Sequence, residues 1–190
     1  MTSEVNGPGK RFTLWLQGCP FKCKGCFNPK LQTKKGGNKI SVNEIFKIIV
    51  NTKDIEGVSF TGGEPFIQAK SLYFLSKKLK KHSLSILSYT GYTKEEILNS
   101  KKKYKILLLK SLDILIDGQY NKNIKSNNSF IGSGNQKIHI FNPCFNKLIN
   151  KTNFNNNKNI ELVINKNGDF LLTGFPDDNI LNTLKQINKQ

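Results

Sequence analysis

The sequence predicts an α/β fold: an incomplete (β/α) barrel with a mostly parallel sheet, followed by a C-terminal β-hairpin and helix. Apolar runs at 11–17, 57–60, 84–89 and 113–116 alternate with amphipathic helical segments, which is typical of repeated βα units. Polar or glycine-rich loops follow these runs, at the strand ends where such folds bind ligands. The chain has 190 residues, whereas a closed barrel of eight βα units needs about 250, so we expect an incomplete barrel.

Length predicts one domain over residues 1–190, with a core of about 8–141 and a C-terminal extension of about 142–190. There is no run of about 18 apolar residues, so no membrane span is expected. The first residues lack an apolar signal core, which favours the cytoplasm. That compartment is reducing, and this disfavours a disulfide framework.

The net charge is +17, from 30 basic and 13 acidic side chains. A basic face could bind nucleic acid, nucleotide or an acidic protein. Many lysines lie at element ends or in loops, which instead indicates composition bias, and Lys10 and Arg11 are expected to be solvated. No strand interleaves aromatic and basic residues, so nucleic acid is not favoured as a partner.

The first strand, 11–17, alternates polar and apolar residues and runs into a loop with three cysteines. After a glycine-rich stretch, Ser41 and Glu44 match a capping box, in which each side chain satisfies a free amide at a helix start. Apolar residues at helical spacing then predict an amphipathic helix over 42–52.

Two further βα units follow. A buried strand at 57–60 ends in the turn TGGEP, and a helix is expected over about 67–81. The strand at 84–89 ends in TGY, after which Thr93 and Glu96 form a second capping box. This box predicts a helix over 94–103, before the strand at 113–116.

The remaining chain departs from the βα pattern. A polar loop is expected at 121–135, a strand at 136–141 and an exposed Asn-rich linker at 150–158. The segments IELVIN and DFLLTG flank the turn sequence KNG, which predicts a β-hairpin. Asp177 or Asp178 is expected to cap a last helix. The residues expected to face inward on that helix are Ile180, Leu181, Leu184 and Ile187.

Cys19, Cys23 and Cys26 lie within eight residues, in the spacing C-x3-C-x2-C. A structural zinc site would need a fourth ligand, Cys144 or His139, and this spacing is not that of paired zinc knuckles. A [4Fe–4S] cluster takes one thiolate per iron, so three cysteines on one loop would leave one iron open to another ligand. The pattern favours the cluster, with zinc, a disulfide and unconnected thiols as alternatives.

The stretch GCPFKCKGCFNP after the first strand, together with GGEP after the next, resembles the radical S-adenosylmethionine (SAM) enzymes. In that superfamily the open iron chelates SAM, which is cleaved by one electron to methionine and a 5′-deoxyadenosyl radical. The resemblance implies cluster ligation by Cys19, Cys23 and Cys26. It also implies SAM binding by Gly62, Gly63, Glu64 and Pro65.

Later segments, SYTGYTKEEI, DILIDGQY and GSGNQKIHIF, resemble the activators of anaerobic ribonucleoside-triphosphate reductase, over about residues 8–141. This branch places an aromatic residue after the third cysteine, as Phe27 is here, where it would pack beside the cluster or SAM. Ser88, Thr90 and Asp117 follow or end strands and could hold SAM, although each could equally serve a cap or turn.

The resemblance implies hydrogen abstraction from a glycine of a partner glycyl radical enzyme, with a flavodoxin or ferredoxin as electron donor. An incomplete barrel would leave an opening wide enough for a loop of such a partner. Two other functions stay open. One is a compact radical SAM enzyme acting on a small molecule, similar to the 7-carboxy-7-deazaguanine synthases. The other is a non-enzymatic iron–sulfur or zinc protein.

Overall fold

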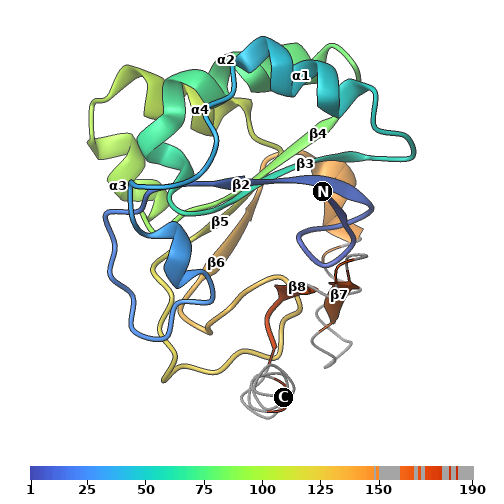
Figure 1. The fold of residues 1–190 in the computed structure, drawn as a ribbon. Helices are drawn as coiled ribbons and strands as arrows, with labels where there is room; N and C mark the ends of the chain where they lie inside the picture. Colours follow the sequence, from blue (N-terminus) through green and yellow to red (C-terminus); the bar gives the residue numbers. More distant parts are fainter. Residues whose placement is uncertain are drawn as a thin grey trace.

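The computed structural model describes residues 1–147, 149, 159–164, 167, 170–176, 180 and 183. Its main sheet has six strands in the order β1 to β6, and the helices cover one face of it (Figure 1). The strands are β1 Thr2–Ser3, β2 Arg11–Leu16, β3 Gly57–Gly62, β4 Ser85–Tyr89, β5 Ile114–Asp117 and β6 Lys137–Ile140. The helices are α1 Val42–Val50, α2 Ala69–Lys80, α3 Lys94–Asn99 and α4 Lys103–Ser111, with 3-10 turns η1 Pro29–Leu31, η2 Pro65–Gln68 and η3 Pro143–Phe145.

The four central strands, β2 to β5, run parallel, and β1 and β6 pair antiparallel at the two edges. The α/β class and the mostly parallel sheet are therefore confirmed. Within the described part of the chain the sheet is open and not a closed barrel. After β5 the chain turns back as β6 instead of adding another parallel unit, so the parallel series ends there.

Both capping boxes form as the sequence predicts. At α1 the Glu44 N–H donates to Ser41 Oγ (3.2 Å), and the Ser41 N–H donates to the Glu44 carboxylate (2.9 Å). At α3 the same pair of bonds joins Thr93 and Glu96. The helix predicted over 94–103 is wrong in its extent, since α3 ends at Asn99 and α4 starts four residues later. Lys101, with φ 53°, takes a left-handed conformation that breaks the helix between them.

The core has two parts, one on each face of the sheet. Phe12, Val58, Phe60, Ile86 and Leu115 belong to the cluster packed against the helices. The other cluster is formed by Leu87, Ile114, Ile116, Phe130, Ile131 and Ile149. Because successive strand residues point to opposite faces, these two sets alternate along β4 and β5. The sheet is thus buried on both sides, as parallel sheets require.

The amino ends of the strands are tied together by Arg11, which is fully buried, so the expectation that it is solvated is wrong. Its guanidinium donates five hydrogen bonds of 2.8 to 3.1 Å. The acceptors are the Ser59 and Ser85 hydroxyls and the Pro8, Val58 and Ser85 carbonyls. Burial lowers the pKa of Arg11 to about 10.

The predicted C-terminal hairpin is confirmed, with β7 Ile160–Ile164 antiparallel to β8 Phe170–Gly174. It lies against the N-terminal segment: the Asn6 side-chain amide donates to Thr173 Oγ1 (2.6 Å), and the Glu4 N–H donates to the Glu161 carboxylate (2.6 Å). The predicted linker at 150–158 and most of the predicted last helix lie outside the described residues. Across the described chain, no helix combines the length and apolar character needed to cross a membrane.

Candidate metal centre

The three clustered cysteines lie in the loop between β2 and α1, at the carboxyl ends of the parallel strands. Cys19, Cys23 and Cys26 are free thiols and half-buried. Cys144 is exposed and belongs to η3, elsewhere in the chain. Cys144 is thus not part of the loop that holds the other three cysteines.

Backbone amides lie close to the three sulfurs. Asn28 N–H donates to Cys26 Sγ (3.4 Å), and the amides of Phe21 and Tyr120 act to lower the pKa of Cys19 and Cys23 respectively. Such N–H groups stabilise a thiolate and also fix the direction in which its lone pairs point. Tyr120 lies just after β5, so two separate loops contribute to this arrangement.

Two of the three thiols, Cys19 and Cys23, nevertheless resist ionisation. Burial raises the pKa of Cys19 to about 11, against the lowering effect of the Phe21 amide, and Glu64 and the other two thiols add to the rise. Burial likewise raises the pKa of Cys23. Three thiols placed together beside a carboxylate are therefore suited to a cationic group that would turn them into ligands.

A single zinc ion does not fit the described residues. No three His, Cys, Asp or Glu side chains among them are arranged around one ion position. Of the two predicted fourth ligands, His139 Nε2 lies 2.9 Å from Asp117 Oδ2 and Cys144 is exposed. A cubane instead distributes three thiolates over three irons, which suits three sulfurs spread along one loop.

The glycine turn after β3 lies directly against the cysteine loop. Gly63 N–H donates to the Leu16 carbonyl (2.7 Å), and Glu64 N–H donates to the Gly18 carbonyl (2.8 Å). A Cβ added at Gly63 would lie 2.3 Å from the Gly18 carbonyl oxygen, and Gly62 has φ +94°. These positions therefore need glycine for a close backbone approach and a left-handed turn.

Glu64 is only 1% exposed and joins two of the predicted site segments. Its carboxylate accepts hydrogen bonds from Thr90 Oγ1, the Gly91 N–H and the Phe66 N–H, each at 2.8 Å. Burial raises the pKa of Glu64, while these three donors oppose the rise. The Thr90 hydroxyl also accepts from the Tyr92 N–H (3.1 Å), so Glu64 and Thr90 together fix the turn after β4.

Ser88 and Asp117 are buried and hydrogen-bonded to the protein. The Ser88 hydroxyl donates to the carbonyl of the next residue (3.1 Å), and Asp117 accepts from the Lys94 N–H (2.7 Å) at the start of α3. Asp117 also pairs with His139. Their contact with SAM stays a prediction.

Aromatic rings hold the cysteine loop on both sides. Phe21, between the first two cysteines, makes an edge contact with Tyr92, with ring centroids 4.8 Å apart. Phe27 lies against Tyr120 (4.8 Å) and Phe175 (5.3 Å). Of these rings, the sequence marked Phe27 and Tyr92 as candidates for the site, but neither Phe21 nor Phe175. The place of Phe21 inside the cysteine motif was an available signal, whereas nothing local marks Phe175.

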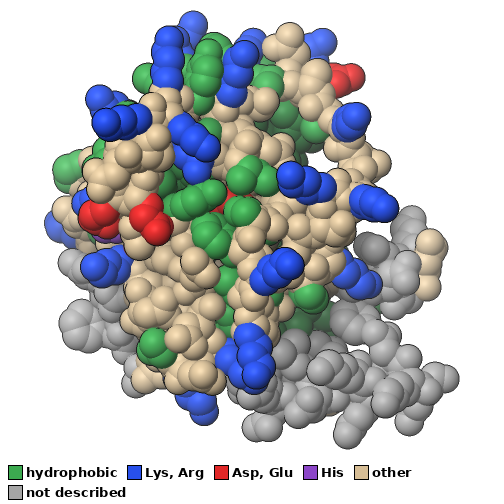
Figure 2. All heavy atoms as spheres, turned by 90° about the vertical axis from the view of Figure 1, so that its left-hand side faces the viewer, with side chains coloured by type: hydrophobic (Ala, Val, Ile, Leu, Met, Phe, Trp, Pro, Cys, Tyr) green, Lys and Arg blue, Asp and Glu red, His purple; other side chains and the backbone are tan. Residues whose placement is uncertain are grey.

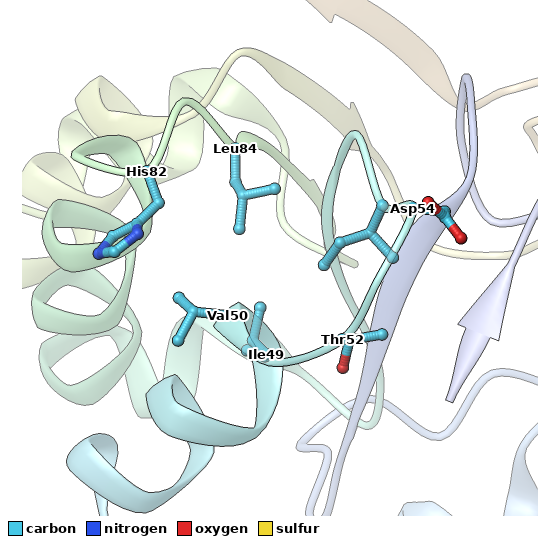
Figure 3. A pocket seen from close by; sticks show the side chains of 7 residues that line it. Ile49, Val50, Thr52, Asp54, His82 and Leu84 are labelled. Carbon is cyan, nitrogen blue, oxygen red and sulfur yellow. The ribbon is translucent and has the colours of Figure 1, made fainter.

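A shallow pocket lies far from the cysteine loop, at the amino ends of β3 and β4 (Figure 3). Ile49 and Val50 at the end of α1 lie across from His82 and Leu84. Figure 2 shows Lys and Arg side chains spread over one face of the molecule instead of gathered in one patch. Neither feature competes with the cysteine loop as a reactive site.

An open α/β sheet with a three-cysteine loop at the carboxyl ends of its parallel strands defines a candidate single-cluster iron–sulfur protein. A family model described as a 4Fe-4S single cluster domain matches residues 5–139. The anaerobic ribonucleoside-triphosphate reductase-activating protein of Vibrio cholerae is 34% identical over 146 residues, 72% of this chain and 92% of that protein. That of Pasteurella multocida is 32% identical over 151 residues, 74% and 93%. The chain belongs to this family of reductase-activating proteins.

Proposed function

We propose that this chain activates an anaerobic ribonucleoside-triphosphate reductase by forming a glycyl radical in it, with a [4Fe–4S] cluster and SAM as cofactors. Family membership over more than two thirds of the chain supports the activity. The observation that carries the chemistry is the loop of three half-buried free thiols at the carboxyl edge of the sheet.

In this proposal Cys19, Cys23 and Cys26 would hold the cluster through their thiolates, and SAM would bind to it at a position that no cysteine occupies. When bound, the two cofactors supply a one-electron cleavage that ends in abstraction of a hydrogen atom from a glycine Cα. The protein orients the thiolates through the amides of Phe21, Asn28 and Tyr120. It also limits the access of water to them by half-burying all three sulfurs.

The glycine turn would position SAM beside the cluster. Gly62 and Gly63 offer backbone next to the cysteine loop, and Pro65 follows them in the same turn. Glu64 and Thr90 are engaged with each other, so we assign them the role of holding two loops at the site in a fixed relation. Ser88 and Asp117 would act in the same indirect way. Phe27 would border the cluster beside Cys26.

The open sheet would serve as an incomplete barrel into which a loop of the reductase enters, with β6 and the hairpin as its borders. A flavodoxin or ferredoxin in the cytoplasm would supply the electron. Charge supports an acidic donor at the cysteine loop, because residues 5–43 contain no Asp or Glu. The exposed Lys22 and Lys24 stand between the three cysteines.

The test is anaerobic reconstitution with iron and sulfide, followed by a SAM titration of the reduced protein monitored by electron paramagnetic resonance. We expect a [4Fe–4S] signal that changes on SAM addition. We also expect 5′-deoxyadenosine formation that rises strongly with the reductase and leaves a glycyl radical signal there. A signal indifferent to SAM would favour a non-enzymatic cluster protein. SAM cleavage unaffected by any glycyl radical enzyme would instead favour a small-molecule substrate.

A further inference from the structure

The C-terminal hairpin reaches the cysteine loop from outside the region that the family model covers. The matched region ends at residue 139, and the hairpin spans β7 and β8. It is held to the N-terminal segment through Asn6 and Thr173. Gly174 then turns with φ +101°, and its neighbour Phe175 leaves the hairpin towards the cysteine loop. The extension therefore places one of its own side chains at the candidate metal centre.

Phe175 belongs to an aromatic cluster that we define as Phe27, Tyr89, Tyr120 and Phe175. The ring of Phe175 contacts those of Phe27 (5.3 Å) and Tyr89 (6.3 Å), both edge-on, and Phe27 in turn contacts Tyr120 (4.8 Å). A Cβ at Gly132 would lie 3.1 Å from both the Phe175 and the Tyr120 ring, so the loop after β5 also closes on this cluster. The four rings come from four separate parts of the chain.

One member of the cluster, Tyr89, has a polar group without a hydrogen-bond partner in the described structure. The Tyr89 hydroxyl, at the end of β4, is buried and makes no hydrogen bond. Burial raises the pKa of Tyr89, which keeps the phenol neutral. A buried hydroxyl without a partner is costly, so packing of the rings has to compensate for it. Phe175 contributes to this packing through its edge contact with the Tyr89 ring.

We propose that Phe175 is a positioning residue of the metal centre, one that holds Phe27, and through it Cys26, in the place required for the third cluster ligand. Phe27 is bonded directly to Cys26, so a ring fixed between Tyr120 and Phe175 limits where the Cys26 sulfur can lie. That Cys26 ligates a cluster rests on the proposed function. That Phe175 restricts the position of Cys26 does not, because it can be tested in the protein without a cluster.

The first experiment therefore uses the metal-free chain. The alkylation rate of each cysteine is measured by mass spectrometry under reducing conditions, with the exposed Cys144 as internal reference. We expect Phe175→Ala to raise the rate at Cys26 about tenfold, the factor that loss of edge-on ring contacts can produce. Cys19, whose loop segment is held by Phe21 and Tyr92, should change much less.

Three further variants show whether the ring itself is responsible. Phe175→Tyr keeps the ring and should restore a rate near that of the wild type. Leu171→Ala, at a 44% exposed position of β8, alters the same hairpin and should leave Cys26 unchanged. Gly132→Ala keeps Phe175 but pushes on its ring, and should raise the Cys26 rate about threefold. If Phe175→Ala does not fold, the Gly132 and Tyr variants still decide the matter.

The second experiment uses the reconstituted holoprotein. In Phe175→Ala we expect iron to pass to a ferrous chelator about tenfold faster than in the wild type, with a broadened cluster signal. Equal alkylation at Cys26 in wild type and Phe175→Ala would overturn the inference, as would an equal increase in Leu171→Ala. A wild-type chain that takes up no cluster would instead contradict the proposed function, while the alkylation result would still stand.

Discussion

Each end of the parallel strands has a buried charged side chain, but the groups around it differ. At the amino ends Arg11 is enclosed by five neutral acceptors and has no carboxylate partner among its hydrogen bonds. At the carboxyl ends Glu64 is enclosed by three neutral donors, and three half-buried thiols follow β2 at the same edge. The amino edge is thus complete by itself, whereas the carboxyl edge is arranged for an added positive group. The amino edge of the sheet thus stabilises the fold, whereas we assign the chemistry to the carboxyl edge.

The largest effect should come from Cys23→Ser. Loss of one of three cluster ligands should reduce bound iron and lower reductase activation at least about a hundredfold. Because the thiol is half-buried and lies in a loop, the thermal stability of the metal-free chain should change little. Iron content and glycyl radical yield check this, with Cys144→Ser as the matched control. If Cys23→Ser binds as much iron as the wild type, the carboxyl edge does not have the chemical role that we assign to it.

Arg11→Leu tests the opposite edge. The change leaves two serine hydroxyls and three carbonyls short of a donor, and should cost about 3 kcal/mol of unfolding free energy. Urea denaturation of the metal-free protein measures this cost. Ser85→Ala removes a single acceptor and should cost far less. If Arg11→Leu is as stable as the wild type, the amino edge does not stabilise the fold in the way described.

Gly63→Ala should affect both stability and the site. The added Cβ would meet the Gly18 carbonyl, so backbone must shift at a cost of about 2 kcal/mol. Activity should fall further than the stability loss explains, because the cysteine loop moves. Gly36→Ala is the control: its Cβ has open space, so only backbone strain of about 1 kcal/mol at φ +93° is added.

The smallest effect concerns pH. Because burial raises the pKa of Glu64 above 4.5, the folded state binds its proton more tightly than the unfolded state. Stability from this group is therefore present below pH 4.5 and is lost as pH rises through the raised pKa. Glu64→Gln should remove that dependence of the unfolding free energy on pH.

Glu44 has the opposite shift, because the hydrogen bonds from Ser41 lower its pKa. Its contribution to stability is lost as pH falls below 4.5, and Glu44→Gln should remove that loss. The measurement is the unfolding free energy from urea denaturation at several pH values. If it changes with pH equally in the two variants, the contrast between Glu64 and Glu44 is wrong.

Much of the fold could be predicted because its signals are local. Capping boxes lie within four residues, and helical spacing along α2 reflects which face of the helix is buried. The extent of α3 was missed because one left-handed residue, Lys101, ends it without a glycine or proline to mark the site. Chain length was enough to predict that the barrel is not closed, but not that β6 runs antiparallel, since the direction of β6 depends on how it pairs with β5.

The sequence by itself determined the four parallel strands, the capped helix starts, the glycine turn and the three-cysteine loop, because spacing over a few residues is enough to fix each of them. Only the tertiary structure decided that Arg11 is buried, that Glu64 bonds to Thr90 and Gly91, and that Phe175 lies against Phe27. The physical reason is the register of the parallel sheet and the return of the hairpin to it. Sheet register and hairpin position bring together side chains that are far apart in sequence, and no local sequence pattern predicts such contacts.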